Sequence, residues 1–265
     1  MNILTTLSFD GTCYSGFQVQ KNAPTVCETF QDALEAVLGQ RVPVIGCSRT
    51  DSGVHAKAFC LNFHAEPRFL LERMPLALNA HLPQDIRVMS ARQVPDGFHA
   101  RYSAAGKEYR YHIRCGWVDS PFTQPYCWRV SAALDLDAME QAAQLLVGRH
   151  DFSAFMSAGS SVQDTVRTVF EVRLEEQGEY LTLVIRADGY LYNMVRIIVG
   201  TLVQVGAGDL SAGSVQQALD TGRRSLAGPT APAKGLFLAQ VFYPPQALGD
   251  TGPGPADCGD QADGL

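Results

Sequence analysis

A single aspartate in a tight polar turn is the first residue of this sequence whose setting suggests chemistry. Asp51 lies in the stretch Ser48 to Gly53, between two apolar runs, 41–45 and 54–63, whose β-branched and aromatic residues predict strands. Aspartates before Ser and Gly commonly cap their own turn through the side chain, and these residues alone favour that simpler interpretation. The alternative is a functional carboxylate presented by the turn.

An arginine on an apolar helix is the second such residue. Arg196 lies within Tyr192–Val205, where apolar residues surround the helix axis, so we predict that this helix is largely buried. A buried guanidinium needs an anionic partner, because leaving it unpaired is costly. Asp51, Asp188 and Asp10 are all candidates, and nearness in sequence favours Asp188. An ion pair that only joins helix to sheet is the alternative to a catalytic role.

Other common catalytic arrangements are not indicated. The six histidines are dispersed without the spacing of metal ligands, so we predict no metal site. No Gly-x-Ser-x-Gly elbow is present to expose a serine nucleophile. The Gly-rich stretch Asp10 to Gln18 lacks the Lys-Ser/Thr ending of a nucleotide P-loop and does not lead directly into a helix.

The elements that must position these residues follow an α+β order that occurs twice. Thr25 is the expected N-cap of the first helix, with Glu28 completing a capping box. The first half is predicted to contain strands at 3–9, 41–45, 54–63 and 86–94 and helices at 25–38 and 69–80. The second half is predicted to contain strands at 108–114, 166–175, 180–187 and 236–243 and helices at 136–146, 192–205 and 214–219. We therefore predict an α+β fold of two similar subdomains, 1–104 and 105–243.

Composition indicates a globular protein of a reducing compartment. The 265 residues are 46% hydrophobic, and the seven scattered cysteines lack the close pairs of zinc or redox motifs, which predicts a cytoplasmic protein. No apolar run is long enough to span a bilayer, and the first residues lack signal-peptide features. Residues 244–265, rich in Pro, Gly and Asp, are predicted to be a disordered acidic tail.

The charge distribution does not exclude a nucleic-acid partner. The net charge is −6, but the tail supplies four of the aspartates without a compensating base. All but four of the 21 basic residues are arginines, whose planar fork suits bidentate phosphate contacts. Arginine is also common in proteins from GC-rich genomes, so composition alone leaves the partner open.

Several stretches together resemble the tRNA pseudouridine synthase A family, in the family's order and from about Asn2 to Tyr243. The central one is Arg-Thr-Asp-Ser-Gly-Val-His at 49–55, and the others lie at 9–18, 25–31, 79–86, 98–101, 107–111, 151–155, 193–200 and 234–238. One departure adjoins the central motif, because Ser48 stands where the family usually has Gly. If that Gly needed a positive φ angle, Ser48 would be strained.

The resemblance implies a fold and an activity. The fold would be two ferredoxin-like subdomains whose sheets meet at a central catalytic cleft. The activity would be isomerisation of uridine to pseudouridine at positions 38 to 40 of the tRNA anticodon stem, without a cofactor or metal. The family is dimeric, so tRNA and a second copy of the chain are the expected partners. In such a dimer an acidic monomer could build one basic groove across a two-fold interface.

The same resemblance implies roles for four residues. Asp51 would be the nucleophile, attacking ribose C1′ or starting a glycal route, with attack on uracil C6 as a further possibility. Arg196 would pair with Asp51 and favour its charged form. Tyr109, which shares a strand face with Tyr111, would stack under the target base. Arg49 would enter the space that the flipped uridine leaves or hold the backbone.

A rival interpretation is a protein that has the fold of this family but does not catalyse the reaction. A non-catalytic RNA-binding or RNA-folding module would also match these motifs, and Ser48 is the observation in its favour. A synthase with other target uridines is a second alternative. Pseudouridine mapping on an unmodified tRNA transcript separates all three.

Overall fold

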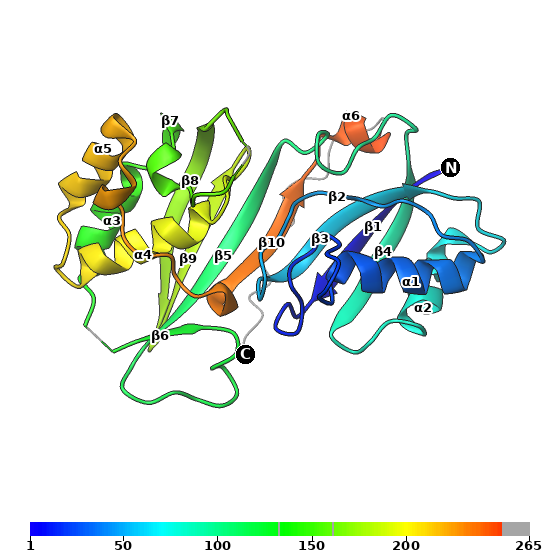
Figure 1. The fold of residues 1–265 in the computed structure, drawn as a ribbon, viewed down its shortest axis with the longest axis horizontal. Coiled ribbons are helices and arrows are strands. Elements are labelled where there is room, and N and C mark those ends of the chain that lie inside the picture. Colours follow the sequence, from blue (N-terminus) through cyan, green and yellow to red (C-terminus); the bar gives the residue numbers. More distant parts are fainter. Residues whose placement is uncertain (132, 161, 251–265) are drawn as a thin grey trace.

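The computed structural model describes residues 1–131, 133–160 and 162–250, and its core is one mixed sheet (Figure 1). The strands run in the order β4-β1-β3-β10-β5-β9-β8-β7, with β2 paired to β3 and β6 to β5. The strands are β1 (Asn2–Phe9), β2 (Ile45–Gly46), β3 (His55–His64), β4 (Ile86–Val94), β5 (Gly106–Cys115), β6 (Trp128–Val130), β7 (Gly148–Asp151), β8 (Val166–Gln177), β9 (Tyr180–Ala187) and β10 (Leu236–Phe242). The helices are α1 (Val26–Leu38), α2 (Met74–Asn79), α3 (Leu136–Gln144), α4 (Met194–Gly206), α5 (Ala212–Thr221) and α6 (Pro245–Leu248).

The last strand, β10, joins the two halves of this sheet. On one edge Phe237 and Leu238 pair in parallel with His55 and Ala56 of β3. On its other edge β10 runs antiparallel to β5. The predicted α+β class is confirmed, but the sheets of the two halves do not merely meet. They form one continuous sheet, because β10 offers a backbone edge to each half.

Separate groups of helices cover the two ends of the sheet. Figure 1 shows α1 and α2 beside β1, β3 and β4, and α3, α4 and α5 beside β8 and β9. The α1 helix starts as predicted, with the Thr25 hydroxyl accepting a hydrogen bond from the Glu28 backbone N–H at 3.3 Å. It ends at Gly39, whose φ of 75° is the left-handed conformation that glycine adopts easily.

The α4 helix is buried on nearly all sides, as its sequence predicts. Eleven of its 13 residues are buried. Gly200 is required there, since a Cβ atom would lie 1.8 Å from the Pro229 carbonyl oxygen. The same crossing segment donates a 3.0 Å hydrogen bond from the Ala231 N–H to the Arg196 carbonyl, which fixes the first turn of α4. Among the helices described, none could cross a membrane.

Two predicted elements of the first half are shorter than expected. The strand predicted at 41–45 is reduced to β2, and Pro43 within it has no N–H to give to a sheet. The helix predicted at 69–80 opens with a 3₁₀ turn at Leu71–Arg73 and becomes α-helical only at Met74, with Pro75 in its first turn. The short strands β6 and β7 were not predicted from the sequence.

The start of the predicted disordered tail is ordered instead. Residues 245–248 form α6, and Asp250 pairs with Arg92 across 2.7 Å. Proline in the first turn suits a short helix, and the ion pair ties its end to β4. Residues 251–265 lie outside the described part of the chain, so the prediction for them stays a prediction.

Candidate active site

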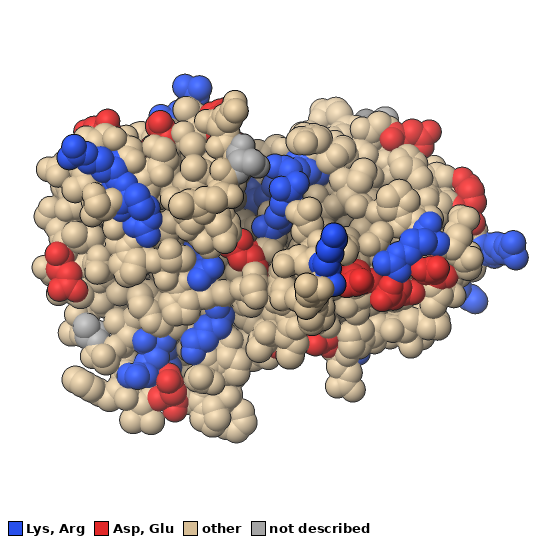
Figure 2. Space-filling view, viewed as in Figure 1, with Lys and Arg blue, Asp and Glu red and all other residues tan. Residues whose placement is uncertain are grey.

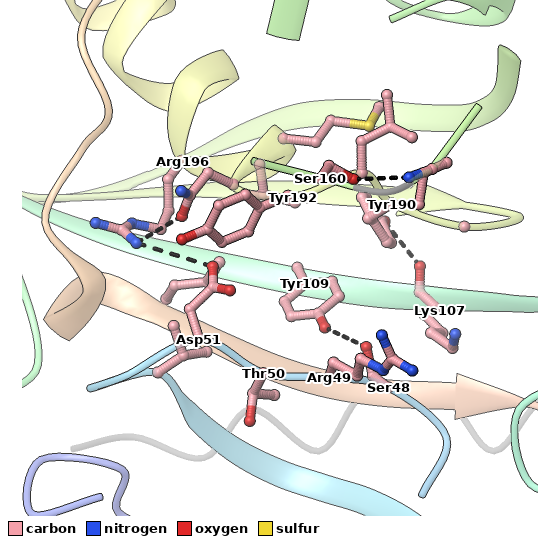
Figure 3. Close-up of a pocket in the computed structure, with 18 of the residues that line it drawn as sticks. Ser48, Arg49, Thr50, Asp51, Lys107, Tyr109, Ser160, Tyr190, Tyr192 and Arg196 are labelled. Carbon is pink, nitrogen blue, oxygen red and sulfur yellow. Dashed lines mark hydrogen bonds and ion pairs between the residues drawn. The ribbon is translucent and has the colours of Figure 1, made fainter. Parts of the chain in front are cut away.

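A cleft of about 780 Å³ contains the four residues singled out from the sequence. Its walls come from the loop between β2 and β3, from β5, from the segment between β9 and α4, and from the first turn of α4. Figure 3 shows Asp51, Tyr109 and Arg196 converging on this space from different elements. The first and second halves of the chain therefore both contribute to one site.

Backbone contacts close the turn that carries Asp51. The Val54 N–H donates to the Asp51 carbonyl oxygen at 3.2 Å. Gly53 takes a φ of 74°, which favours glycine. Because the carbonyl closes this turn, the carboxylate is left to face the cleft, unlike in the simpler interpretation of a side-chain cap.

The Gly-rich stretch 10–18 supports this loop from behind. The Phe17 N–H donates to the Thr50 carbonyl oxygen at 3.2 Å, and the Gly53 N–H donates to the Tyr14 carbonyl oxygen, also at 3.2 Å. Gly16 permits the approach, because a Cβ atom there would lie 2.4 Å from the Thr50 carbonyl oxygen. The stretch therefore holds the aspartate loop in position.

Arg196 reaches the cleft from the first turn of α4. Its Nε donates to the Ala231 carbonyl and its Nη1 to Asn193 Oδ1, each at 2.7 Å. Nη1 also lies 3.8 Å from Asp51 Oδ2, so the predicted contact is confirmed as a long ion pair. The guanidinium is only partly buried, since the side chain of Arg196 is 18% exposed and that of Asp51 25%. The arginine projects from the end of a buried helix into an open cleft.

The two competing acids have other partners. Asp188 Oδ1 accepts a hydrogen bond from the Thr168 backbone N–H at 3.0 Å. Asp10 Oδ1 accepts from the Thr12 backbone N–H at 2.9 Å and lies 3.0 Å from His55 Nδ1. Of the three candidates, Asp51 is therefore the one that meets the guanidinium.

Burial has the largest effect on the pKa of Asp51. Desolvation raises this pKa above its ordinary value of 3.8, and Arg196 lowers it by a smaller amount. The guanidinium does favour the charged form, as expected, but it does not outweigh desolvation. A carboxylate of raised pKa is more basic than a solvated one, which suits an attacking group.

Tyr109 contributes its ring to the cleft from β5. Its side chain lies on the same face as Tyr111, two residues along, as strand geometry requires. The Tyr109 ring meets Tyr190 edge-on, with centroids 4.9 Å apart. Tyr111 is fully buried and donates its hydroxyl proton to the Pro232 carbonyl. Of the two tyrosines, Tyr109 is the one that lines the cleft.

Arg49 and Ser48 lie beside Asp51 in the same loop. Arg49 is exposed and lines the cleft, so its guanidinium can reach a bound molecule. Ser48 carries no strain, because Asn193 is the one non-glycine residue of the described chain with a positive φ. The Ser48 hydroxyl instead lies 3.2 Å from the Tyr109 hydroxyl. The departure from the family pattern thus adds a contact without distorting the loop.

Comparison with known proteins decides the family. A family model described as tRNA pseudouridine synthase matches residues 6–103 and 142–244. The tRNA pseudouridine synthase A of Thermoanaerobacter sp. (strain X514) is 46% identical over 242 residues, which cover 91% of this chain and 99% of the relative. The chain belongs to the tRNA pseudouridine synthase A family. Two enzymes of the same name agree. That of Acetivibrio thermocellus is 44% identical over 91% of this chain and 99% of its own length. That of Shouchella clausii is 47% identical over 89% of this chain and 91% of its own length.

The protein is therefore an isomerase of tRNA processing that acts as a pseudouridine synthase. Uridine and pseudouridine differ only in which uracil atom joins the ribose. The synthase consequently has to break the bond between ribose C1′ and uracil N1 and form one between C1′ and C5, while retaining the base.

Asn193 is a site residue that sequence reasoning missed as such. Its φ of 59° is left-handed, and its side chain accepts from Arg196 and donates to Ser157 Oγ at 2.9 Å. Asparagine tolerates this conformation better than most residues. An asparagine directly before the helix that carries Arg196 was therefore the signal in the sequence that could have identified it. Asn193 thus positions the guanidinium of the synthase from the N-cap of α4.

Asn193→Ala should destabilise the synthase by more than Asn193→Gly. Both variants lose the hydrogen bonds to Arg196 and Ser157, but alanine also pays roughly 1–2 kcal/mol for the left-handed conformation. Urea unfolding of the two variants measures the difference. Equal unfolding free energies would show that the backbone conformation contributes nothing.

Ser48→Gly should uncouple the Tyr109 hydroxyl from the aspartate loop. The lost contact is worth about 1 kcal/mol in unfolding free energy. A double-mutant cycle with Tyr109→Phe isolates it, because Ser48→Gly should cost less in the Phe background than in the wild type. Strictly additive effects would mean that the two hydroxyls do not interact.

Proposed function

We propose that Asp51 is the nucleophile with which this synthase converts uridines 38 to 40 of the tRNA anticodon stem-loop to pseudouridine. The observation that carries the proposal is the position of Asp51, turned into the cleft and 3.8 Å from a guanidinium of the opposite half of the chain. Asp188, the other aspartate that lines the cleft, instead accepts a hydrogen bond from the Thr168 backbone N–H.

The reaction balances without an external reactant. In the C1′ route, an Asp51 oxygen bonds to ribose C1′ as the C1′–N1 bond breaks, and the electron pair of the broken bond leaves with uracil. The base turns, C5 attacks C1′, and the carboxylate departs. C5 then loses its proton, and N1 gains one. A glycal route or addition to C6 would begin at the same carboxylate.

Access to a stacked uridine requires the base to leave its helix. Extrusion costs a few kcal/mol, and stacking on Tyr109 would return roughly 1–3 kcal/mol. The Tyr109 ring is held by the Tyr190 edge and the Ser48 hydroxyl, so it is preorganised for this contact. Arg49, exposed beside Asp51, would fill the vacated stack or hold the backbone.

The proposal extends to organisation and partners. We propose that residues 1–104 and 105–243 act as two ferredoxin-like subdomains, and that the synthase works as a cytoplasmic homodimer with each tRNA touching both copies. A chain of net charge −6 gains most from such an arrangement, because a two-fold interface can combine two basic surfaces into one groove. Sedimentation equilibrium measures the expected dimer.

Pseudouridine mapping on an unmodified tRNA transcript tests the function. The synthase should modify positions 38, 39 and 40 where they are uridines and leave other uridines unchanged. Modification elsewhere would keep the chemistry and change the target. Tight RNA binding with no pseudouridine would support the non-catalytic module instead, although Ser48, the observation behind that rival, shows no strain.

A further inference from the structure

Lys107 is a buried cation in the cleft that the proposed chemistry does not use. It lies on β5 two residues before Tyr109, on the same strand face, and is 8% exposed. Its backbone carbonyl accepts a hydrogen bond from the Tyr190 hydroxyl at 2.9 Å, so its main chain is fixed. Its side chain lines the cleft, as Figure 3 shows. The ammonium group is what remains to be explained.

No acid of the described chain accounts for this ammonium. The groups that act on its pKa after burial are Cys47, Arg101 and Arg167. Burial raises the pKa of the Cys47 thiol to about 12, so this neighbour is a neutral group. The two arginines are cations that also line the cleft. Lys107 is therefore a buried cation that shares its cleft with two further cations.

The carboxylates that line the cleft are engaged elsewhere. Asp51 faces Arg196, and Asp188 accepts from the Thr168 N–H. Glu108, the sequence neighbour of Lys107, points to the other face of β5 and pairs with Arg110 at 2.9 Å. Figure 2 shows Lys and Arg side chains gathered in the hollow between the two halves of the molecule, beside one acidic patch.

A buried cation with two arginines in the same cleft is stabilised most directly by an anion. Burial and the two arginines lower the pKa of Lys107 from 10.5, and a bound anion would act in the opposite direction. Arg101 is exposed at the rim while Lys107 lies on the floor. This path from solvent to floor suits a strand that enters the cleft from outside rather than an isolated ion.

We propose that Arg101, Lys107 and Arg167 form an anion site that binds a phosphodiester of the tRNA strand next to the nucleotide stacked on Tyr109. The inference rests on the proposed function, because it takes the strand to be that of the tRNA substrate. It adds a sequence-independent contact that fixes the register of the strand, which is what phosphate contacts supply. Lys107 acts here in binding and takes no part in the bond changes.

The salt dependence of RNA binding tests this site. Fluorescence anisotropy with an anticodon stem-loop RNA, repeated over a series of KCl concentrations, gives the slope of log affinity against log salt. Lys107→Met should weaken binding about tenfold and reduce the magnitude of the slope by about 0.7 to 0.9, the value of one lost phosphate contact. Lys57→Met is the control variant, which removes the same charge elsewhere. Lys57 is exposed, and its charge acts on His112, on the opposite face of β5 from Tyr109.

An unchanged slope in Lys107→Met would overturn the proposal, even with weaker binding, because lost packing changes affinity without releasing fewer ions. Arg101→Gln provides a second, surface variant that should fold regardless, and its slope should fall as well. Unchanged slopes in both variants would equally overturn the site. Pseudouridine formation by the wild type on the same RNA separates the two proposals. An inactive wild type whose slope still depends on Lys107 would reject the chemistry and retain the site.

Free phosphate is the other source of the same chemistry. Inorganic phosphate, titrated at constant ionic strength, should compete with RNA weakly in the wild type, and Lys107→Met should remove that competition. Strong binding of phosphate to the wild type combined with an unchanged RNA slope in Lys107→Met would assign the site to a free anion. That result would overturn the proposal for the RNA strand.

Discussion

Asp51→Asn should lower the rate of pseudouridine formation at least about a thousandfold while leaving tRNA affinity within an order of magnitude. Asparagine keeps the size of the side chain and one oxygen, but its amide is a far weaker nucleophile than a carboxylate. Single-turnover mapping on a tRNA transcript measures the rate, and filter binding measures the affinity. Asp188→Asn is the matched control, because Asp188 lines the same cleft and would keep an oxygen for the Thr168 N–H.

Asp51→Asn should also be slightly more stable than the wild type. Burial raises the folded-state pKa of Asp51 above its ordinary 3.8, so the folded state binds the proton more tightly than the unfolded one. At neutral pH the carboxylate is charged in the unfolded state, and its desolvation reduces stability. Asparagine removes that cost, and the gain should vanish below about pH 3.8, where the acid is protonated in both states. Retained turnover would contradict the role given to Asp51, and a loss of stability at neutral pH would contradict the effect of burial on its pKa.

Arg196→Gln should slow the reaction roughly a hundredfold near neutral pH and move the acid limb of its pH–rate profile upward. The guanidinium lowers the pKa of Asp51, so its removal leaves desolvation unopposed and raises that pKa further. A higher pKa means that the carboxylate becomes protonated, and activity falls, at a higher pH than in the wild type. Single-turnover rates from about pH 4 to pH 8 measure the shift.

Arg196→Lys separates charge from geometry. Lysine keeps the positive charge but cannot reproduce the planar fork that binds both Ala231 and Asn193. The acid limb should therefore move less than in Arg196→Gln, while the rate still falls. Identical acid limbs in the wild type and Arg196→Gln would mean that the guanidinium does not act on the titrating group. Thermal unfolding of each variant identifies losses that come from the fold alone.

Local signals in the sequence were sufficient for much of the fold. The start of α1 follows from Thr25 and Glu28, and the burial of α4 follows from apolar residues all around its axis. The contact between Asp51 and Arg196 required more than local pattern. Electrostatics demanded a partner for the arginine, and the family resemblance selected the aspartate from three candidates.

The remaining features depend on contacts that no short stretch encodes. The insertion of β10 between β3 and β5 is set by pairing between segments far apart in the chain. The pKa of Asp51 is a balance between desolvation and one guanidinium, and only the three-dimensional surroundings determine which is larger. Lys107 looked like an ordinary strand residue, because its isolation from acids depends on which groups fold around it.

The position of β10 has a consequence for biosynthesis. Ribosomes deliver the amino-terminal part of a chain first, yet this sheet is completed by residues 236–242. Until they emerge, β3 and β5 each lack a neighbour and expose unpaired backbone groups, which are a template for aggregation. Assembly of the cleft is thus postponed to the end of translation. A transcript truncated before this strand would yield two separate half-sheets, each with an unpaired edge prone to aggregation, instead of a weak enzyme.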